Sequence, residues 1–152
     1  MMAADEVQSR LGRTGKWFAS EHFDLVPDIV CMAKGIAAGL PLGVTASRAD
    51  LMDWTPGSHA STFGGNPVSA SAAIEVIKII KEESLLENAE KVGGHLNKRL
   101  REMQEQHPMI GDVRGRGLMV GVELVKDIDS KEPAKKETEE VMLCCFEKGA
   151  AL

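Results

Sequence analysis

Apolar residues occur in short runs separated by polar segments in the first third of the chain. Three runs, MMAADEV, PDIVCMAK and LGVTAS, are a few residues long and rich in apolar side chains. Runs of this length predict strands, and we expect the first, over residues 1–7, to be buried. QSRLGRTGK, between the first two, is predicted to be a loop, and residues 55–66 have turn composition throughout.

Two helices are predicted in the middle of the chain. Asn66 and Pro67 form a helix start, with asparagine as N-cap and proline at the first helical position. Residues 84–87, Ser-Leu-Leu-Glu, have the pattern of a capping box and predict the start of a second helix, which Pro108 ends. Apolar residues at three- and four-residue steps give this second helix one apolar stripe: Leu85, Ala89, Val92, Leu96, Leu100 and Met103.

The last third contains a strand, a loop and a helix. LMVGVELV predicts a strand over residues 118–125, residues 126–136 form a charged loop, and KETEEVMLCCFEKG is a helix that Gly149 ends. Strands that alternate with helices indicate α/β architecture. We expect residues 67–107 to connect a first α/β portion, residues 1–66, with a smaller second portion, residues 108–152. Both ends of the chain have the pattern of a cut element, so we expect an internal piece of a longer protein.

Composition narrows the classes of function. Charged residues are 27%, the net charge is −5 and the pI is about 5.4, which argues against a nucleic-acid binder. No apolar stretch approaches the ~20 residues of a membrane span. The three cysteines lack metal-type spacing and are expected to be reduced, buried thiols, which fits a cytoplasmic protein. The four histidines are scattered and suggest no metal site.

Lys34 stands where an apolar run meets a glycine-containing turn. Desolvation lowers the pKa of a lysine amine, and the neutral amine can form a Schiff base with an aldehyde. A lysine at a strand end that merely reaches solvent is the plainer interpretation of this stretch alone. Asp5, at the end of the preceding strand, favours a ligand-binding role for Lys34, because ligands of open α/β sheets bind beyond the carboxyl ends of the strands. A buried carboxylate there can keep a pyridine nitrogen protonated.

Four motifs in order resemble the class III aminotransferases, which are fold-type I enzymes that use pyridoxal 5′-phosphate. They are DEVQ with GRTGK, then PDIVCMAKGIAAGLPLG, then STFGGNP, and then VRGRGLMVGVEL. The resemblance covers essentially the whole chain. It implies the end of the large cofactor-binding domain, mainly parallel sheet with helices, followed by bridging helices and part of a small α+β domain.

The resemblance also implies a role for five residues. Lys34 matches the catalytic lysine that binds the cofactor covalently and moves protons at the substrate. Asp5 matches the partner of the pyridine nitrogen, and Gln8 the residue near the phenolic oxygen. Thr62 matches a threonine that contacts the cofactor phosphate of a neighbouring subunit, and Arg114 the arginine that holds the substrate carboxylate. The implied substrates are an amino acid or amine and a 2-oxo acid, and the implied assembly is a homodimer or higher homo-oligomer.

Departures from the family pattern leave alternatives open. Arg10 stands where the family usually has glycine. The family's phosphate cradle, ring-stacking aromatic residue and much of its substrate pocket precede the DEVQ segment. The isolated chain is therefore expected to be inactive, and a folded or associating module without catalysis is one alternative. A racemase or aminomutase of the same family is another. A nucleotide-binding protein is disfavoured, since neither GRTGK nor GRGLMVG fits a phosphate-loop or dinucleotide motif.

Overall fold

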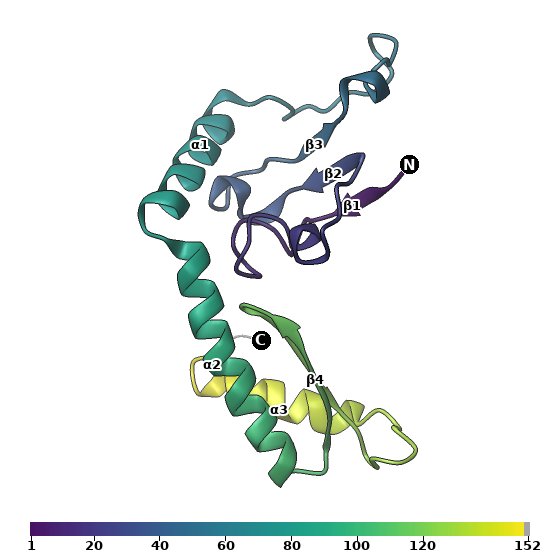
Figure 1. Cartoon of the computed structure of the whole chain (residues 1–152), viewed down its shortest axis with the longest axis vertical. Helices are drawn as coiled ribbons and strands as arrows, with labels where there is room; N and C mark the ends of the chain where they lie inside the picture. The colour runs from purple at the N-terminus through teal and green to yellow at the C-terminus, as the bar shows by residue number, and fades with distance from the viewer. Residues whose placement is uncertain (151–152) are drawn as a thin grey trace.

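The computed structural model describes residues 1–150 and consists of two small sheets joined by two consecutive helices. Figure 1 shows the three-stranded sheet beside α1 and the second sheet beside α2 and α3. Helix α1 spans Pro67–Glu82 and α2 spans Leu85–Gln106. Each of the two helices therefore accompanies one sheet.

The first sheet has the order β1-β2-β3. Its strands are β1 (Ala3–Asp5), β2 (Ile29–Met32) and β3 (Val44–Ser47). The pairing of β1 with β2 is parallel, whereas β2 and β3 are antiparallel. All three predicted strands are present, but the prediction that the first is buried is wrong. Ala3 and Asp5 are exposed, because within the described residues β1 packs mainly against its neighbour β2 and its faces are left largely uncovered.

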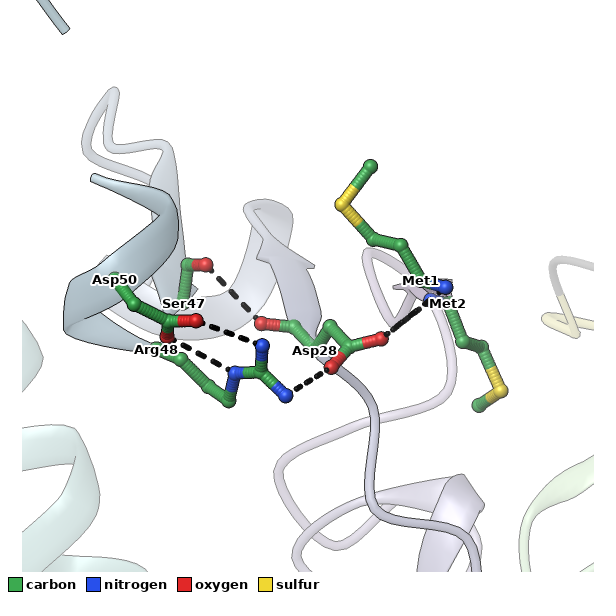
Figure 2. A network of polar contacts seen from close by, with 6 residues as sticks. All are labelled: Met1, Met2, Asp28, Ser47, Arg48 and Asp50. Atoms are coloured by element: carbon green, nitrogen blue, oxygen red, sulfur yellow. Dashed lines mark hydrogen bonds and ion pairs between the residues drawn. The ribbon is translucent and has the colours of Figure 1, made fainter. Parts of the chain in front are cut away.

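A polar network ties the beginning of β2 to its neighbours (Figure 2). The carboxylate of Asp28 accepts a hydrogen bond from the backbone N–H of Met2 at 2.7 Å and pairs with Arg48 at 2.9 Å. Arg48 also pairs with Asp50 at 2.8 Å, and the Ser47 hydroxyl donates to the Asp28 carbonyl at 3.1 Å. The Met2 N–H and the Arg48 charge hold the pKa of Asp28 below its ordinary value. One carboxylate thus links segments next to all three strands.

The two central helices begin differently. The Asn66 side chain accepts hydrogen bonds from the backbone N–H groups of Val68 at 2.9 Å and Ser69 at 3.3 Å, which confirms the predicted N-cap. The capping box predicted at Ser84 is wrong, although α2 does begin at the next residue. Ser84 has a φ of 51° and makes no side-chain cap. Only two residues separate α1 from α2, and the left-handed backbone that turns the chain there is not the extended conformation of an N-cap.

The short 3₁₀ helix η2 (Lys34–Ala37) packs against α1. Ile36, Ala37 and Ala73 form the buried centre of this contact. Two other 3₁₀ helices, η1 (Ala19–Phe23) and η3 (Ala49–Leu51), lie in the loops around the sheet. The core beneath Lys34 therefore fixes the turn that carries its side chain.

The second sheet is an antiparallel hairpin of β4 (Ile110–Arg116) and β5 (Met119–Leu124), followed by α3 (Lys135–Glu147). The predicted β5 and α3 are present, whereas β4 was missed because glycines and charged residues interrupt its apolar pattern. Ile110 and Val113 are buried, and α2 packs against β4. The cysteines are free, as expected, but the prediction that they are buried is wrong, because helix α3 leaves Cys144 exposed. Among residues 1–150, no helix is both long and apolar enough to cross a membrane.

The two sheets meet where three stretches of backbone touch. Gly93 of α2 lies against Gly117, which turns the chain from β4 to β5. Gly117 in turn lies against Thr14 of the loop after β1, and the backbone N–H of Leu118 donates to the Arg13 carbonyl at 2.8 Å. This contact brings the loop after β1 against the hairpin more than a hundred residues later.

Candidate active site

Lys34 lies two residues after β2 and begins η2 with a φ of 49°. This left-handed conformation is unfavourable for a residue with a Cβ, and such residues are typical of functional sites. The side chain is exposed and lines a cavity of about 770 Å³. The same cavity is lined by Gln8, so the structure brings together two of the five predicted site residues.

Four segments make up the walls of this Lys34 cavity. They are the loop after β1, the turn at residues 33–35, the junction of α1 with α2, and residues 118–120 at the start of β5. Its volume lies within the ~300–1,000 Å³ of typical small-molecule sites. The cavity therefore has room for a flat heterocycle beside Lys34, and both sheets contribute to it.

Asp5 is the last residue of β1 and is paired in parallel register with Cys31 of β2. Lys34 follows three residues after Cys31, so Asp5 and Lys34 lie at or just beyond the carboxyl ends of adjacent parallel strands. The Asp5 carboxylate is exposed and accepts a hydrogen bond from the backbone N–H of Val7 at 3.1 Å. Asp5 is not among the residues that line the Lys34 cavity.

The neighbouring carboxylate, Glu6, was not singled out from the sequence, yet it is only 3% exposed. It accepts hydrogen bonds from the Ser9 hydroxyl and from the backbone N–H groups of Ala19 at 3.1 Å and Ser20 at 2.8 Å. Burial alone would raise the pKa of Glu6, but these hydrogen bonds outweigh it and lower the pKa. Glu6 therefore closes the loop after β1 as a buried, charged acceptor.

Arg10 lies in the same loop and was noted in the sequence only as a departure. Its side chain is 5% exposed, and its Nε and Nη1 atoms have no hydrogen-bond partner. Burial lowers the pKa of Arg10, while the charge of Glu6 opposes that shift. Arg10 also lines the Lys34 cavity. A buried guanidinium cannot be foreseen from a polar, glycine-containing loop, because arginine in such a loop is usually exposed.

Thr62 lies in the exposed loop before α1, where the Gly64 N–H donates to the Ser61 carbonyl at 3.2 Å. Thr62 lines neither the Lys34 cavity nor the second one described next. Within one chain, the structure thus does not bring Thr62 together with Lys34 and Gln8.

Arg114 lies on β4 and lines a second cavity of about 430 Å³. Met119 lines both cavities, which are therefore neighbours. The Nη1 atom of Arg114 donates to Asp112 at 2.6 Å and to Glu123 at 2.9 Å, and these bonds raise the pKa of Arg114. Its guanidinium is already paired, so a substrate carboxylate would have to compete with these two side chains.

Comparison with known proteins places the chain in a family. The sequence profile of the family described as aminotransferase class III matches residues 1–151. The chain therefore belongs to the class III aminotransferase family, as its four motifs predicted. A leucine/methionine racemase of Thermococcus litoralis is 51% identical over 150 residues, which are 98% of this chain and 34% of that protein.

Two further similarities support the same assignment. The 4-aminobutyrate aminotransferase GabT of Escherichia coli is 44% identical and is matched by all of this chain over 36% of its own length. The taurine:2-oxoglutarate aminotransferase of Bifidobacterium kashiwanohense, solved with PLP and glutamate, superimposes with a TM-score of 0.91. It is 26% identical, over 99% of this chain and 36% of that one. The predicted α/β fold, part of a PLP-dependent transferase, is confirmed, and the chain spans about a third of the length of these relatives.

Proposed function

We propose that this sequence supplies the lysine side of the active site of a pyridoxal-phosphate-dependent aminotransferase. The reaction would move an amino group between an amino acid or amine and a 2-oxo acid. One observation carries the proposal: Lys34 and Gln8, which come from separate loops, line one cavity at the carboxyl end of the sheet. Its volume suits a flat cofactor and a small substrate.

The residues of the cavity fit pyridoxal phosphate in part. The Lys34 amine is the group that would bond the aldehyde carbon and then carry a proton to and from the substrate carbon. The Gln8 amide would donate to the phenolic oxygen. Asp5 lies outside the lining of the cavity, and its carboxylate would have to turn toward the cavity to hold a proton on the pyridine nitrogen. When bound, pyridoxal phosphate supplies an electron sink for the negative charge left by the departing proton.

A second copy of the chain would add one further residue to the site. Thr62 is exposed and does not line its own Lys34 cavity, which supports a role at the cofactor phosphate of a neighbouring subunit. Arg114 would hold the substrate carboxylate with its planar guanidinium once its hydrogen bonds to Asp112 and Glu123 are broken. We therefore infer a homodimer or a higher homo-oligomer. The free thiols support a reducing compartment such as the cytoplasm.

Racemisation is the second candidate, since the relative at 51% identity is a racemase. Both reactions begin with removal of a proton by the lysine and differ in whether the amino group leaves. Incubation of an active protein that contains this sequence with an L-amino acid and pyruvate separates them: a new 2-oxo acid and alanine indicate transfer, whereas the D-amino acid alone indicates racemisation.

The role of Lys34 is tested by trapping its bond to the cofactor. The 152-residue chain is mixed with millimolar pyridoxal phosphate, reduced with borohydride and digested, and the labelled lysines are identified by mass spectrometry. We expect preferential labelling of Lys34, which Lys34→Ala abolishes and which Lys16→Ala, a change at another exposed lysine, leaves intact. Equal labelling of Lys16 and Lys34 would exclude a built site. We also expect weak cofactor binding and no turnover by this chain alone, and robust transamination would contradict that expectation.

A further inference from the structure

The proposed chemistry leaves one buried cation in the Lys34 cavity without a role. Arg10 is 5% exposed, and its Nε and Nη1 atoms have no acceptor. A buried donor without an acceptor destabilises the folded state, and a charged donor does so more strongly. Such a group is tolerated where a ligand supplies the missing acceptor. Because Arg10 lines the same cavity as Lys34, that ligand and Lys34 would share one space.

No carboxylate of residues 1–150 takes up the guanidinium of Arg10. Glu6 is near enough to act on Arg10 electrostatically. The oxygens of Glu6, however, accept hydrogen bonds from Ser9, Ala19 and Ser20, and no ion pair joins Glu6 to Arg10 within the described residues. Glu6 therefore balances part of the charge of Arg10 but leaves its N–H groups free for an anion.

We propose that Arg10 binds a carboxylate of the substrate amino acid or 2-oxo acid inside the Lys34 cavity, as a contact separate from the one proposed for Arg114 in the neighbouring cavity. A guanidinium offers N–H groups in a plane that matches the two oxygens of a carboxylate. The nearby charge of Glu6 favours a singly charged anion, because a doubly charged phosphate would meet greater repulsion. Only the identity of the anion as a substrate carboxylate rests on the proposed function.

Nuclear magnetic resonance of the unmodified chain tests the site directly. The Nε–H signal of Arg10, assigned by its loss in Arg10→Lys, is followed while pyruvate is added without cofactor. We expect a saturable shift of the Arg10 signal and little change at Arg13, an exposed arginine that lines the same cavity. An Arg10 signal that does not move, or parallel shifts of both arginines, would overturn the proposal. The titration itself uses only the unmodified chain, and Arg10→Lys serves only to assign the signal.

Variants measure the contribution of Arg10 to affinity. Loss of a hydrogen bond to a charged group predicts that Arg10→Gln weakens pyruvate binding by about tenfold or more. Arg13→Gln should change it by less than about twofold, as expected for an exposed charge. Equal effects of the two substitutions count against the proposal. Tighter binding of inorganic phosphate than of pyruvate would also contradict the proposal, because it would indicate that Arg10 binds a phosphate group.

Failure of the proposed function gives a different pattern. Lys34→Ala should still bind pyruvate through Arg10, since no covalent bond to the cofactor is involved. Pyruvate binding that depends on Arg10, together with unselective lysine labelling, would leave the anion site standing and remove the aminotransferase assignment. Selective labelling of Lys34 with no effect of Arg10→Gln would keep that assignment and remove the anion site.

Discussion

Adjacent glycines in α2 are predicted to respond oppositely to the same substitution. Gly93 is buried against the turn between β4 and β5, whereas Gly94 is exposed. A Cβ added at Gly93 would lie 2.1 Å from the carbonyl carbon and oxygen of Gly117, far inside the 3.4–4 Å of ordinary contact. A Cβ at Gly94 would meet nothing within 4 Å. Gly93→Ala therefore requires the turn to move by more than about 1 Å.

The turn has no free space to move into. A Cβ on Gly117 would itself lie 2.5 Å from the carbonyl carbon of Thr14, so the backbone behind Gly117 is already close. Overpacking of this kind lowers stability by about 1–3 kcal/mol or more. The higher helix propensity of alanine offsets about 1 kcal/mol of that. We expect Gly93→Ala to lower the free energy of unfolding by up to about 2 kcal/mol or more, and Gly94→Ala to raise it by up to about 1 kcal/mol.

Urea unfolding of the wild type and both variants, followed by circular dichroism, measures the difference. Thermal unfolding should show it too, at about 2–4 °C per kcal/mol for a chain of this size. Gly94→Ala is the matched control, since it makes the same chemical change one residue away on the same helix. If Gly93→Ala is as stable as Gly94→Ala, the close approach of the three backbones is not present in solution.

Four further results are expected. Hydrogen bonds lower the pKa of Glu6 on folding, so its contribution to stability is complete above its ordinary pKa of about 4.3 and is lost as the pH falls through the folded-state pKa. Glu6→Gln should therefore lower the free energy of unfolding at pH 7 and make it depend less on pH in the acid range. Parallel stability-against-pH curves for the variant and the wild type would argue against this role. Asn66→Ala should lower the free energy of unfolding by about 1 kcal/mol through loss of the N-cap, and no change in the urea midpoint would contradict the cap. Lys34→Gly should raise stability by about 1 kcal/mol relative to Lys34→Ala because φ is 49° there, and the opposite order in melting temperature would rule out that backbone conformation. Light scattering should show self-association, since many large apolar side chains are exposed, and a monodisperse monomer would refute it.

Local signals in the sequence predicted the elements that local interactions form. Asn66 and Pro67 begin α1 because their side chains act within one turn of the helix. The exposure of β1 was not predictable from MMAADEV, since it depends on which strands lie beside it. The capping pattern at Ser84 failed for a related reason: the short connection between α1 and α2 forces a left-handed backbone there.

The site was predicted to a different extent. Lys34 and Gln8 were identified through the family resemblance, and the structure brings them to one cavity. The other residues that line this cavity depend on tertiary structure, because residues 118–120 reach the cavity from the second sheet. The burial of Arg10 likewise arises from the packing of its loop against α2 and the hairpin. No spacing of residue types in the sequence carries that information.

The Asp28 network, which Figure 2 shows, lies just before β2, whereas Lys34 follows the other end of that strand. At the first end, charged groups that are not among the lining residues of the Lys34 cavity link the strands. The other end of β2, which Lys34 follows, does not have to align the strands, so an unfavourable backbone conformation at Lys34 is tolerated there. Substitutions at Arg48 are therefore expected to change the stability of the sheet while Lys34, the proposed catalytic lysine, keeps its position.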